Sequence, residues 1–302
     1  MPPRFRLYEG QGEFAGVSRG YRRAVGAGAA WLASAIALLA TVDSTSAEAP
    51  GRVVSMNLCT DQLAMLLASG GQLVSVSYLA ADATVSVLAG EAGAFALNHG
   101  QAEEIFLMQP DLVLTSTYTT RATTAILRRL GFRVEEFPPE ASFDDIRANV
   151  RRMGALLGRE ARAEELLGAM DTALASIPAR SADAPTVALY YANQITAGRS
   201  TLAGEVVNRA GLINMGEKLG LDGTQKLSLE QLVMAKPDLI ATHNAYPAPA
   251  LAYDAQLHPA FRAALQGRQP VDIPDKYWIC GGPFTAEAVK LLSDAARREG
   301  SR

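Results

Sequence analysis

The feature that most constrains the fold is a short sequence element that occurs twice in the chain. The first copy runs from Glu103 to Val113 and the second from Glu230 to Ile240, and in each the glutamate stands seven residues before a Pro-Asp-Leu sequence. The copies are 127 residues apart, both at the glutamate (103 and 230) and at the proline (110 and 237). Each copy predicts an amphipathic helix headed by acidic residues, followed by an apolar run typical of a buried parallel strand. Two such units predict two α/β lobes with a ligand cleft at the C-terminal ends of their strands.

The segment between the two copies predicts a pair of helices. Apolar residues follow helical spacing on both sides of Gly158, which is expected to end the first helix, while Ser142 is expected to begin it and Pro178 to stop the second. A helix over 160–177 would be about 27 Å long, enough to join two lobes. We therefore expect an N-terminal lobe over 50–158, a linking helix over 159–178 and a C-terminal lobe over 179–302.

The other elements are predicted from shorter patterns. The segments 83–100 and 214–226 show no clear period and are expected to be irregular. Thr60 or Asp61 is expected to cap the first helix of the first lobe. Further strands are expected at 53–56, 73–76, 112–115, 132–137, 187–191 and 271–273. Further helices are expected at 62–67, 126–130, 202–210 and 284–297.

Composition excludes some classes of protein. The 302 residues are 49% hydrophobic, which excludes a disordered chain and is enough for two ordinary cores. The formal net charge of −3 gives no support for nucleic-acid binding by bulk charge.

Residues 1–49 have the pattern of an export signal. Three arginines precede an apolar run over 24–42, and Ala47-Glu48-Ala49 matches a signal-peptidase site. We expect a signal peptide over 1–49 that is cleaved before Pro50, so that the mature protein lies in the periplasm. The alternative is an uncleaved membrane anchor, since the run approaches spanning length.

The two cysteines, Cys59 and Cys280, stand at strand-to-helix junctions, one in each lobe. Free thiols lining the cleft are the leading interpretation. The alternatives are a disulfide, a contact with a metal or haem, and inert buried side chains. A nucleophilic cysteine would need a base, for which His99 and His243 are candidates without a local signature.

Side-chain metal sites usually need three or four ligands, and the chain has three histidines, so we expect no resident metal or cofactor. Aromatic residues instead follow several predicted strands on the cleft side, a placement suited to stacking on a large flat ligand. Tyr190 and Tyr191 should point to opposite faces, so that one of them can face the cleft. The aromatic candidates are Tyr78, Tyr118, Tyr191, Tyr246, Tyr277 and Trp278.

The chain from about Arg52 to Ala296 resembles the class III substrate-binding proteins of bacterial ABC importers, which bind cobalamin, ferric siderophores or haem. The resemblance rests on the paired Glu and Pro-Asp-Leu elements, the central helix and Trp278 before the last helix. It implies an α/β fold of two Rossmann-like lobes with parallel sheets, joined by a single rigid helix. It also implies that Glu103 and Glu230 dock onto a membrane permease.

The leading hypothesis is a monomeric periplasmic receptor that delivers a bulky metal chelate to an ABC permease and its ATPase. The alternatives are a periplasmic enzyme using Cys59 or Cys280, and an interaction module without a ligand. The expected ligand-binding residues are Asn57, Cys59, Tyr78, His99, Tyr118, Tyr191, Arg199, His243, Tyr246, Trp278 and Cys280.

Overall fold

Both copies of the repeated element form the same structure in the computed structural model, which describes residues 49–118, 121–243 and 250–300. The helices α2 (Ala102–Met108) and α8 (Leu229–Ala235) each carry the glutamate as their second residue. Each helix ends at a left-handed residue, with φ 48° at Gln109 and 47° at Lys236. The strands β4 (Leu112–Ser116) and β10 (Leu239–Thr242) follow three residues later. The predicted helix-to-strand units are therefore confirmed.

The aspartate of each Pro-Asp pair ties the new strand to the first strand of its own sheet. Asp111 accepts hydrogen bonds from the backbone N–H groups of Gly51 and Arg52, at 3.0 and 2.8 Å. Asp238 accepts one from the backbone N–H of Thr186 at 2.8 Å and another from its hydroxyl at 2.7 Å. The same side chain thus performs the same task in both halves.

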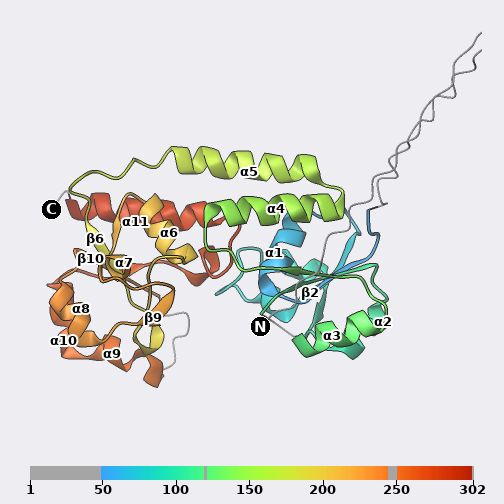
Figure 1. Cartoon of the computed structure of the whole chain (residues 1–302), viewed down its shortest axis with the longest axis horizontal. Helices are drawn as coiled ribbons and strands as arrows, with labels where there is room; N and C mark the ends of the chain where they lie inside the picture. The colour runs from blue at the N-terminus through green and yellow to red at the C-terminus, as the bar shows by residue number, and fades with distance from the viewer. Residues whose placement is uncertain (1–48, 119–120, 244–249, 301–302) are drawn as a thin grey trace, which may run out of the picture. The chain divides into compact units, whose positions relative to one another are not determined.

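The first half of the chain forms a five-stranded sheet in the order β3-β2-β1-β4-β5, in which all pairs are parallel. Its remaining strands are β1 (Val53–Ser55), β2 (Leu73–Ser77), β3 (Ala96–Asn98) and β5 (Val134–Phe137). The helices α1 (Leu58–Leu67) and α3 (Arg121–Arg129) complete this half (Figure 1).

The second half forms a four-stranded parallel sheet in the order β11-β10-β6-β8. Its other strands are β6 (Thr186–Leu189), β8 (Ile213–Asn214) and β11 (Val271–Asp272). A separate antiparallel pair joins β7 (Ile195–Ala197) to β9 (Thr224–Lys226). The helices of this half are α6 (Leu202–Arg209), α7 (Met215–Lys218), α8, α9 (Asp254–Leu257), α10 (Pro259–Leu265) and α11 (Thr285–Gly300). The predicted α/β class with two parallel sheets is confirmed.

Both faces of each sheet are buried, which explains why the strands are apolar without alternation. In β1, Val53 packs into the large core and Val54 into a second cluster that includes Ile105 of α2. In β10, Leu239 packs into the large core and Ile240 into a cluster with α8 and α10. Successive strand residues point to opposite faces, so each sheet separates two apolar layers.

The helices α4 (Phe143–Leu157) and α5 (Glu160–Ala175) lie where the sequence predicts a helix pair. Ser142 accepts a hydrogen bond from the backbone N–H of Asp145, and Gly158 ends α4 with a φ of 65°. α5 has 16 residues and is therefore about 24 Å long. It packs on α4 and, further along, on α11 (Figure 1).

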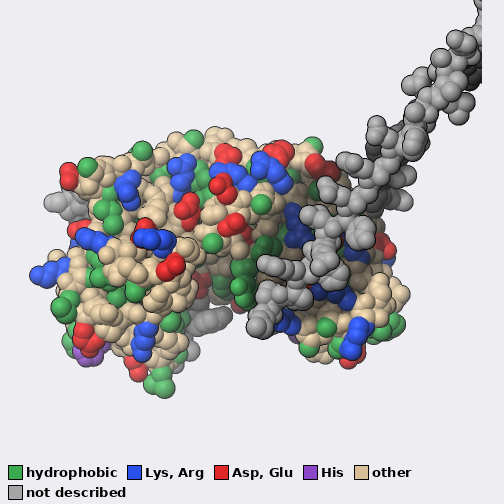
Figure 2. All heavy atoms as spheres, viewed as in Figure 1, with side chains coloured by type: hydrophobic (Ala, Val, Ile, Leu, Met, Phe, Trp, Pro, Cys, Tyr) green, Lys and Arg blue, Asp and Glu red, His purple; other side chains and the backbone are tan. Residues whose placement is uncertain are grey.

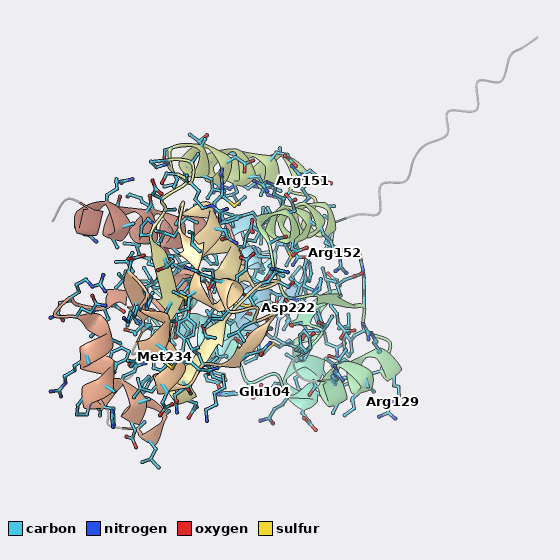
Figure 3. All side chains as sticks on the ribbon, turned by 60° about the vertical axis from the view of Figure 1, so that its left-hand side comes forward. Glu104, Arg129, Arg151, Arg152, Asp222 and Met234 are labelled. Carbon is cyan, nitrogen blue, oxygen red and sulfur yellow. A yellow bond between two sulfur atoms is a disulfide. The ribbon has the colours of Figure 1, made fainter. Side chains whose placement is uncertain are left out.

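The packing of α5 on α4 and α11 joins the two halves through one hydrophobic core. The described residues of both halves cluster as one compact unit. One buried cluster contains Leu112 of the first sheet, Met153 of α4, Leu167 of α5 and Val289 of α11. Ion pairs reinforce the α4–α5 contact, including Arg147 with Asp171 at 2.6 Å and Arg151, labelled in Figure 3, with Glu164 at 2.6 Å. The two sheets are thus attached to a common apolar layer.

Three local predictions are wrong. α1 begins at Leu58, and Asn57 caps it by accepting a hydrogen bond from the backbone N–H of Cys59. Asp61 is instead fully buried and accepts two hydrogen bonds from Ser77. The segment 83–100 contains β3, and 214–226 contains α7 and β9, because short elements of two to four residues leave no detectable period.

No helix in the described ranges is both long and apolar enough to cross a membrane. The expected signal peptide lies outside the described residues, as does Tyr246.

Candidate functional site

A pocket of about 710 Å³ lies between the two halves and takes residues from both. The first half contributes residues that follow β4 and β5, namely Tyr118 and 139–141, together with Cys59. The second half contributes residues that follow β6 and β10, together with the segment before α11. The surface is indented between the halves, with hydrophobic side chains along the indentation (Figure 2). This volume is within the usual range for small-molecule sites.

Four aromatic side chains line this pocket: Tyr118, Tyr191, Tyr253 and Trp278. Trp278 is 7% exposed and meets the Tyr191 ring edge to face, with centroids 6.0 Å apart. Tyr118 is 72% exposed and so stands free at the mouth. The neighbouring Tyr190 faces away, fully buried and stacked on Phe261, as the strand alternation predicts. The pocket therefore combines a fixed aromatic wall with a free aromatic side chain.

Two hydroxyl groups of the pocket lining have no hydrogen-bond partner. The Tyr191 Oη and the Thr196 Oγ1 are both buried and unpaired, and Thr196 is 0% exposed. Burial also raises the pKa of Tyr191. A buried hydroxyl left unpaired costs about 1–3 kcal/mol, and neither oxygen is exposed to the open pocket.

Two carboxyl groups face the same pocket. Glu140 accepts hydrogen bonds from the Asn149 Nδ2 at 2.6 Å and from the backbone N–H of Gly281 at 3.2 Å. Asp275 begins the turn that leads to Trp278 and also lines the pocket. Burial raises the pKa of both carboxyl groups. His243 completes the polar lining, and its Nδ1 lies 2.7 Å from an Asp272 oxygen.

The cysteines form a disulfide between Cys59 of α1 and Cys280 in the segment before α11, with their Cα atoms 5.1 Å apart. Cys59 lines the pocket and Cys280 is buried beside Leu58 and Val85. The interpretation of the pair as free thiols is therefore wrong. The strand order brings the two junctions together at the cleft, which sequence spacing does not reveal.

Several other predicted site residues do not line this pocket. Tyr78 stacks on His99 with ring centroids 5.3 Å apart, and His99 also contacts Glu104 at 3.2 Å. Tyr78 follows β2 and His99 follows β3, and these strands lie toward the opposite edge of the sheet from β4 and β5. Asn57 serves as the cap of α1, and Arg199 borders a neighbouring pocket, where it lies 3.6 Å from Glu217.

The sequence prediction omitted Tyr253, Thr196 and the two carboxyl groups. Both acids directly follow a proline, in Pro139-Glu140 and Pro274-Asp275, a weak turn signal that could have drawn attention to them. Within the described ranges, no group of three or more His, Cys, Asp or Glu side chains is placed to hold a metal ion.

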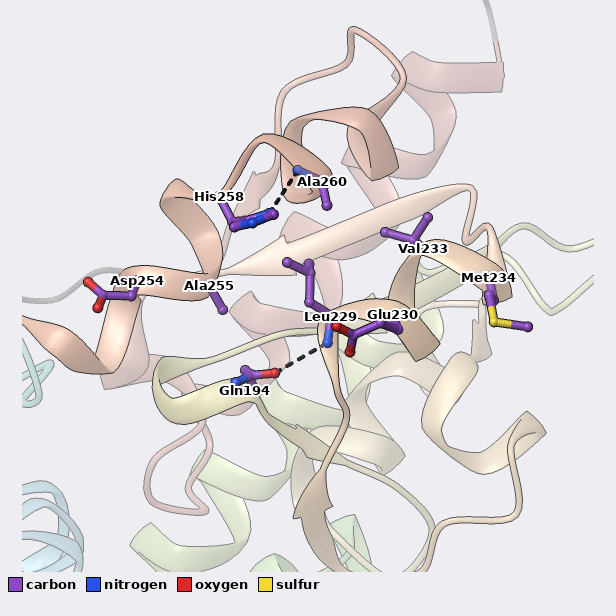
Figure 4. Close-up of a pocket in the computed structure, with 9 residues that line it drawn as sticks. All are labelled: Gln194, Leu229, Glu230, Val233, Met234, Asp254, Ala255, His258 and Ala260. Atoms are coloured by element: carbon purple, nitrogen blue, oxygen red, sulfur yellow. Dashed lines mark hydrogen bonds between the residues drawn. The ribbon is translucent and has the colours of Figure 1, made fainter.

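Glu103 and Glu230 lie outside the cleft, exposed in the first turns of α2 and α8. Glu230 also borders a second pocket, of about 630 Å³, lined by α8, α9 and the start of α10 (Figure 4). There the Gln194 Oε1 accepts a hydrogen bond from the Leu229 N–H at 3.2 Å. All residues that line this second pocket come from the C-terminal half.

Comparison with known proteins shows similarity to binding proteins. A model described as "Periplasmic binding protein" matches residues 53–256. A cobalamin-binding protein of Halobacterium salinarum is 27% identical over 202 residues, which are 64% of this chain and 54% of that protein. The chain therefore spans about half the length of the curated relatives it matches.

Solved structures share the fold. The apo periplasmic haem-binding protein RhuT from Roseiflexus sp. RS-1 has a TM-score of 0.68 at 24% identity, over 81% of this chain and 98% of that one. The periplasmic vitamin B12 binding protein BtuF of Vibrio cholerae has a TM-score of 0.61 at 20% identity, over 84% and 99%. At these identities the likeness establishes the architecture.

Proposed function

The chain belongs to the periplasmic binding protein family, which consists of binding proteins and not enzymes, and we propose that it is the receptor of an ABC importer for a bulky metal chelate. The chelate would be a corrinoid such as cobalamin, a ferric siderophore or haem, delivered to a membrane permease. The relatives named above are described as cobalamin- and haem-binding proteins.

The observation that carries this proposal is the aromatic pocket between the halves. Aromatic faces bury large apolar area, and the few polar groups beside them can orient a ligand. A pocket built in this way favours a large, partly flat ligand over a small ion.

The disulfide supports a location outside the cytoplasm, since such bonds persist mainly in oxidising compartments. It also argues against the alternative of a cysteine enzyme, because no free cysteine is present to act as a nucleophile. We propose that the apolar segment 24–42 belongs to a cleaved signal peptide and that the mature protein resides in the periplasm.

Visible absorption provides a direct test of ligand binding. Protein recovered by osmotic shock would be dialysed against cyanocobalamin, ferrichrome or haemin, and the retained chelate would be measured by its own absorption. We expect at least one chelate to be retained at a one-to-one ratio. Retention of none of them would refute the receptor function and would favour an interaction module with an empty cleft.

The repeated glutamates support a further part of the proposal, the docking onto a permease. A carboxylate in the first turn of a helix is also favoured by the helix dipole, by about 0.3–1 kcal/mol. Hydrogen bonds with its own backbone N–H and with Ser228 lower the pKa of Glu230, which keeps it charged. Two exposed carboxylates in equivalent units, joined by one core, are suited to meet arginines on two permease subunits.

Charge reversal separates docking from simple helix capping. We expect the Glu103→Arg/Glu230→Arg variant to keep ligand affinity and to lose uptake in cells. The matched control is Glu160→Arg/Glu165→Arg, which reverses two exposed glutamates on α5. Normal uptake by the first variant, or equal loss by the control, would contradict the docking role.

A further inference from the structure

Two acidic side chains, Glu140 and Asp275, line the cleft pocket, and His243 is the basic side chain in its described lining. Glu140 and Asp275 belong to different halves of the protein, yet both line the same pocket. Glu140 accepts hydrogen bonds from Asn149 and Gly281, which hold it in place; burial raises its pKa, and these hydrogen bonds offset part of that rise. The pocket therefore presents two carboxyl groups, one from each half, to whatever enters it.

Among the described residues that line this pocket, there is no lysine or arginine. Three basic residues close in sequence to the lining have contacts of their own: Lys276 lies over the Tyr277 ring, Arg199 pairs with Glu217, and Arg121 donates to the Thr117 carbonyl. The undescribed segments 119–120 and 244–249 have the sequences Thr-Thr and Asn-Ala-Tyr-Pro-Ala-Pro, so they add no basic residue. In the described lining an anionic ligand would find His243 as its one candidate countercharge, and the Nδ1 of His243 already lies 2.7 Å from an Asp272 oxygen.

The remaining lining suits a ligand that is uncharged or positively charged. Aromatic faces such as those of Tyr118 and Trp278 attract cations and bury neutral surfaces. The carboxyl oxygens of Glu140 and Asp275 can accept hydrogen bonds from the N–H groups of neutral amides. Like charges brought together in a partly desolvated site repel strongly, and this penalty is a common means of rejecting a wrong ligand.

We propose that this pocket selects metal chelates without net negative charge and rejects anionic ones through Glu140 and Asp275. The inference rests on the proposed receptor function and adds the charge class of the ligand. It distinguishes uncharged corrinoids and hydroxamate chelates from ferric catecholates, whose complexes are anionic.

Three probes test it by equilibrium dialysis of the full protein: cyanocobalamin, which is uncharged; ferrioxamine B, which is cationic; and ferric enterobactin, which is anionic. We expect one of the first two to bind at least roughly ten-fold more tightly than the third. Binding of ferric enterobactin as tight as that of the others would overturn the charge selection and leave the receptor function intact. Binding of none of the three would overturn the charge selection, and it would overturn the receptor function as well if haemin, whose propionates are anionic, is also not retained.

Neutral variants assign the selection to the two carboxyl groups. We expect Glu140→Gln/Asp275→Asn to reduce the preference against ferric enterobactin by roughly ten-fold. Glu160→Gln/Glu165→Gln, which removes the same charge from α5, should leave it unchanged. Should the Glu140 change disturb folding, the single Asp275→Asn variant takes its place, with a smaller reduction expected. An unchanged preference in a folded neutral variant would refute the assignment.

Discussion

Removal of the disulfide between Cys59 and Cys280 should lower stability strongly. The bond joins residues 221 apart in sequence, so it restricts nearly the whole described chain in its unfolded state. The loop-entropy relation gives about 5 kcal/mol for a loop of this length, and losing a native disulfide commonly costs roughly 2–5 kcal/mol. We therefore expect Cys59→Ala/Cys280→Ala to unfold at a clearly lower urea concentration than the wild type.

The alanine variant also removes two buried sulfur atoms, so the wild type should be measured with and without reductant as well. Reduction keeps the sulfur atoms and breaks the bond, and it should account for most of the loss in the free energy of unfolding. The alanine variant itself should not respond to reductant. Two reactive thiols in the denatured, unreduced wild type, or a urea midpoint unaffected by reductant, would show that the reasoning is wrong.

Three further predictions concern the pocket, a buried acid and the linking helices. Trp278→Ala should weaken chelate binding by about 1–3 kcal/mol through lost aromatic burial, while Trp278→Phe should retain most of the binding free energy. Unchanged affinity in a folded Trp278→Ala variant would show that this residue serves the core and not the ligand. Burial raises the pKa of Asp61 from 3.8 to about 6, so folding favours its protonated form. Its contribution to the free energy of unfolding is therefore greatest below pH 3.8 and decreases by about 3 kcal/mol as the pH rises past 6. The stability of the wild type relative to Asp61→Asn should therefore be greater at low pH than at neutral pH in urea titrations, and a constant difference would contradict this. Small-angle scattering should change little on ligand binding, because α5 packs on helices of both halves; a large compaction would contradict a rigid link.

The sequence predicted the architecture where patterns are local and repeated. The spacing from Glu103 to Pro110, and from Glu230 to Pro237, marked two helices and two strands correctly because burial on both sheet faces produces uninterrupted apolar runs. Ser142 and Gly158 marked the ends of α4 because capping depends on the residue itself.

The site was predicted less completely, since its geometry depends on strand order. Tyr78 and Tyr118 both follow a strand, yet only Tyr118 lines the pocket. Tyr118 follows β4, which lies beside β5 toward the edge of the sheet that contributes to the pocket, whereas Tyr78 follows β2 on the other side of β1. Pairing of the cysteines likewise depends on a distance across the two halves. Glu140 and Asp275 come from turns, where no periodic pattern marks a side chain as facing a pocket.

The core that runs from the first sheet through α4, α5 and α11 into the second sheet has a consequence for signalling. A receptor whose lobes close on a ligand reports through its shape that it is loaded. When the lobes share one packed core, the empty and loaded forms present nearly the same outline to a permease. If the chain docks onto a permease as proposed, empty molecules would compete with loaded ones for the same docking site, and the transporter would have to detect the chelate itself, at the pocket beside Tyr118.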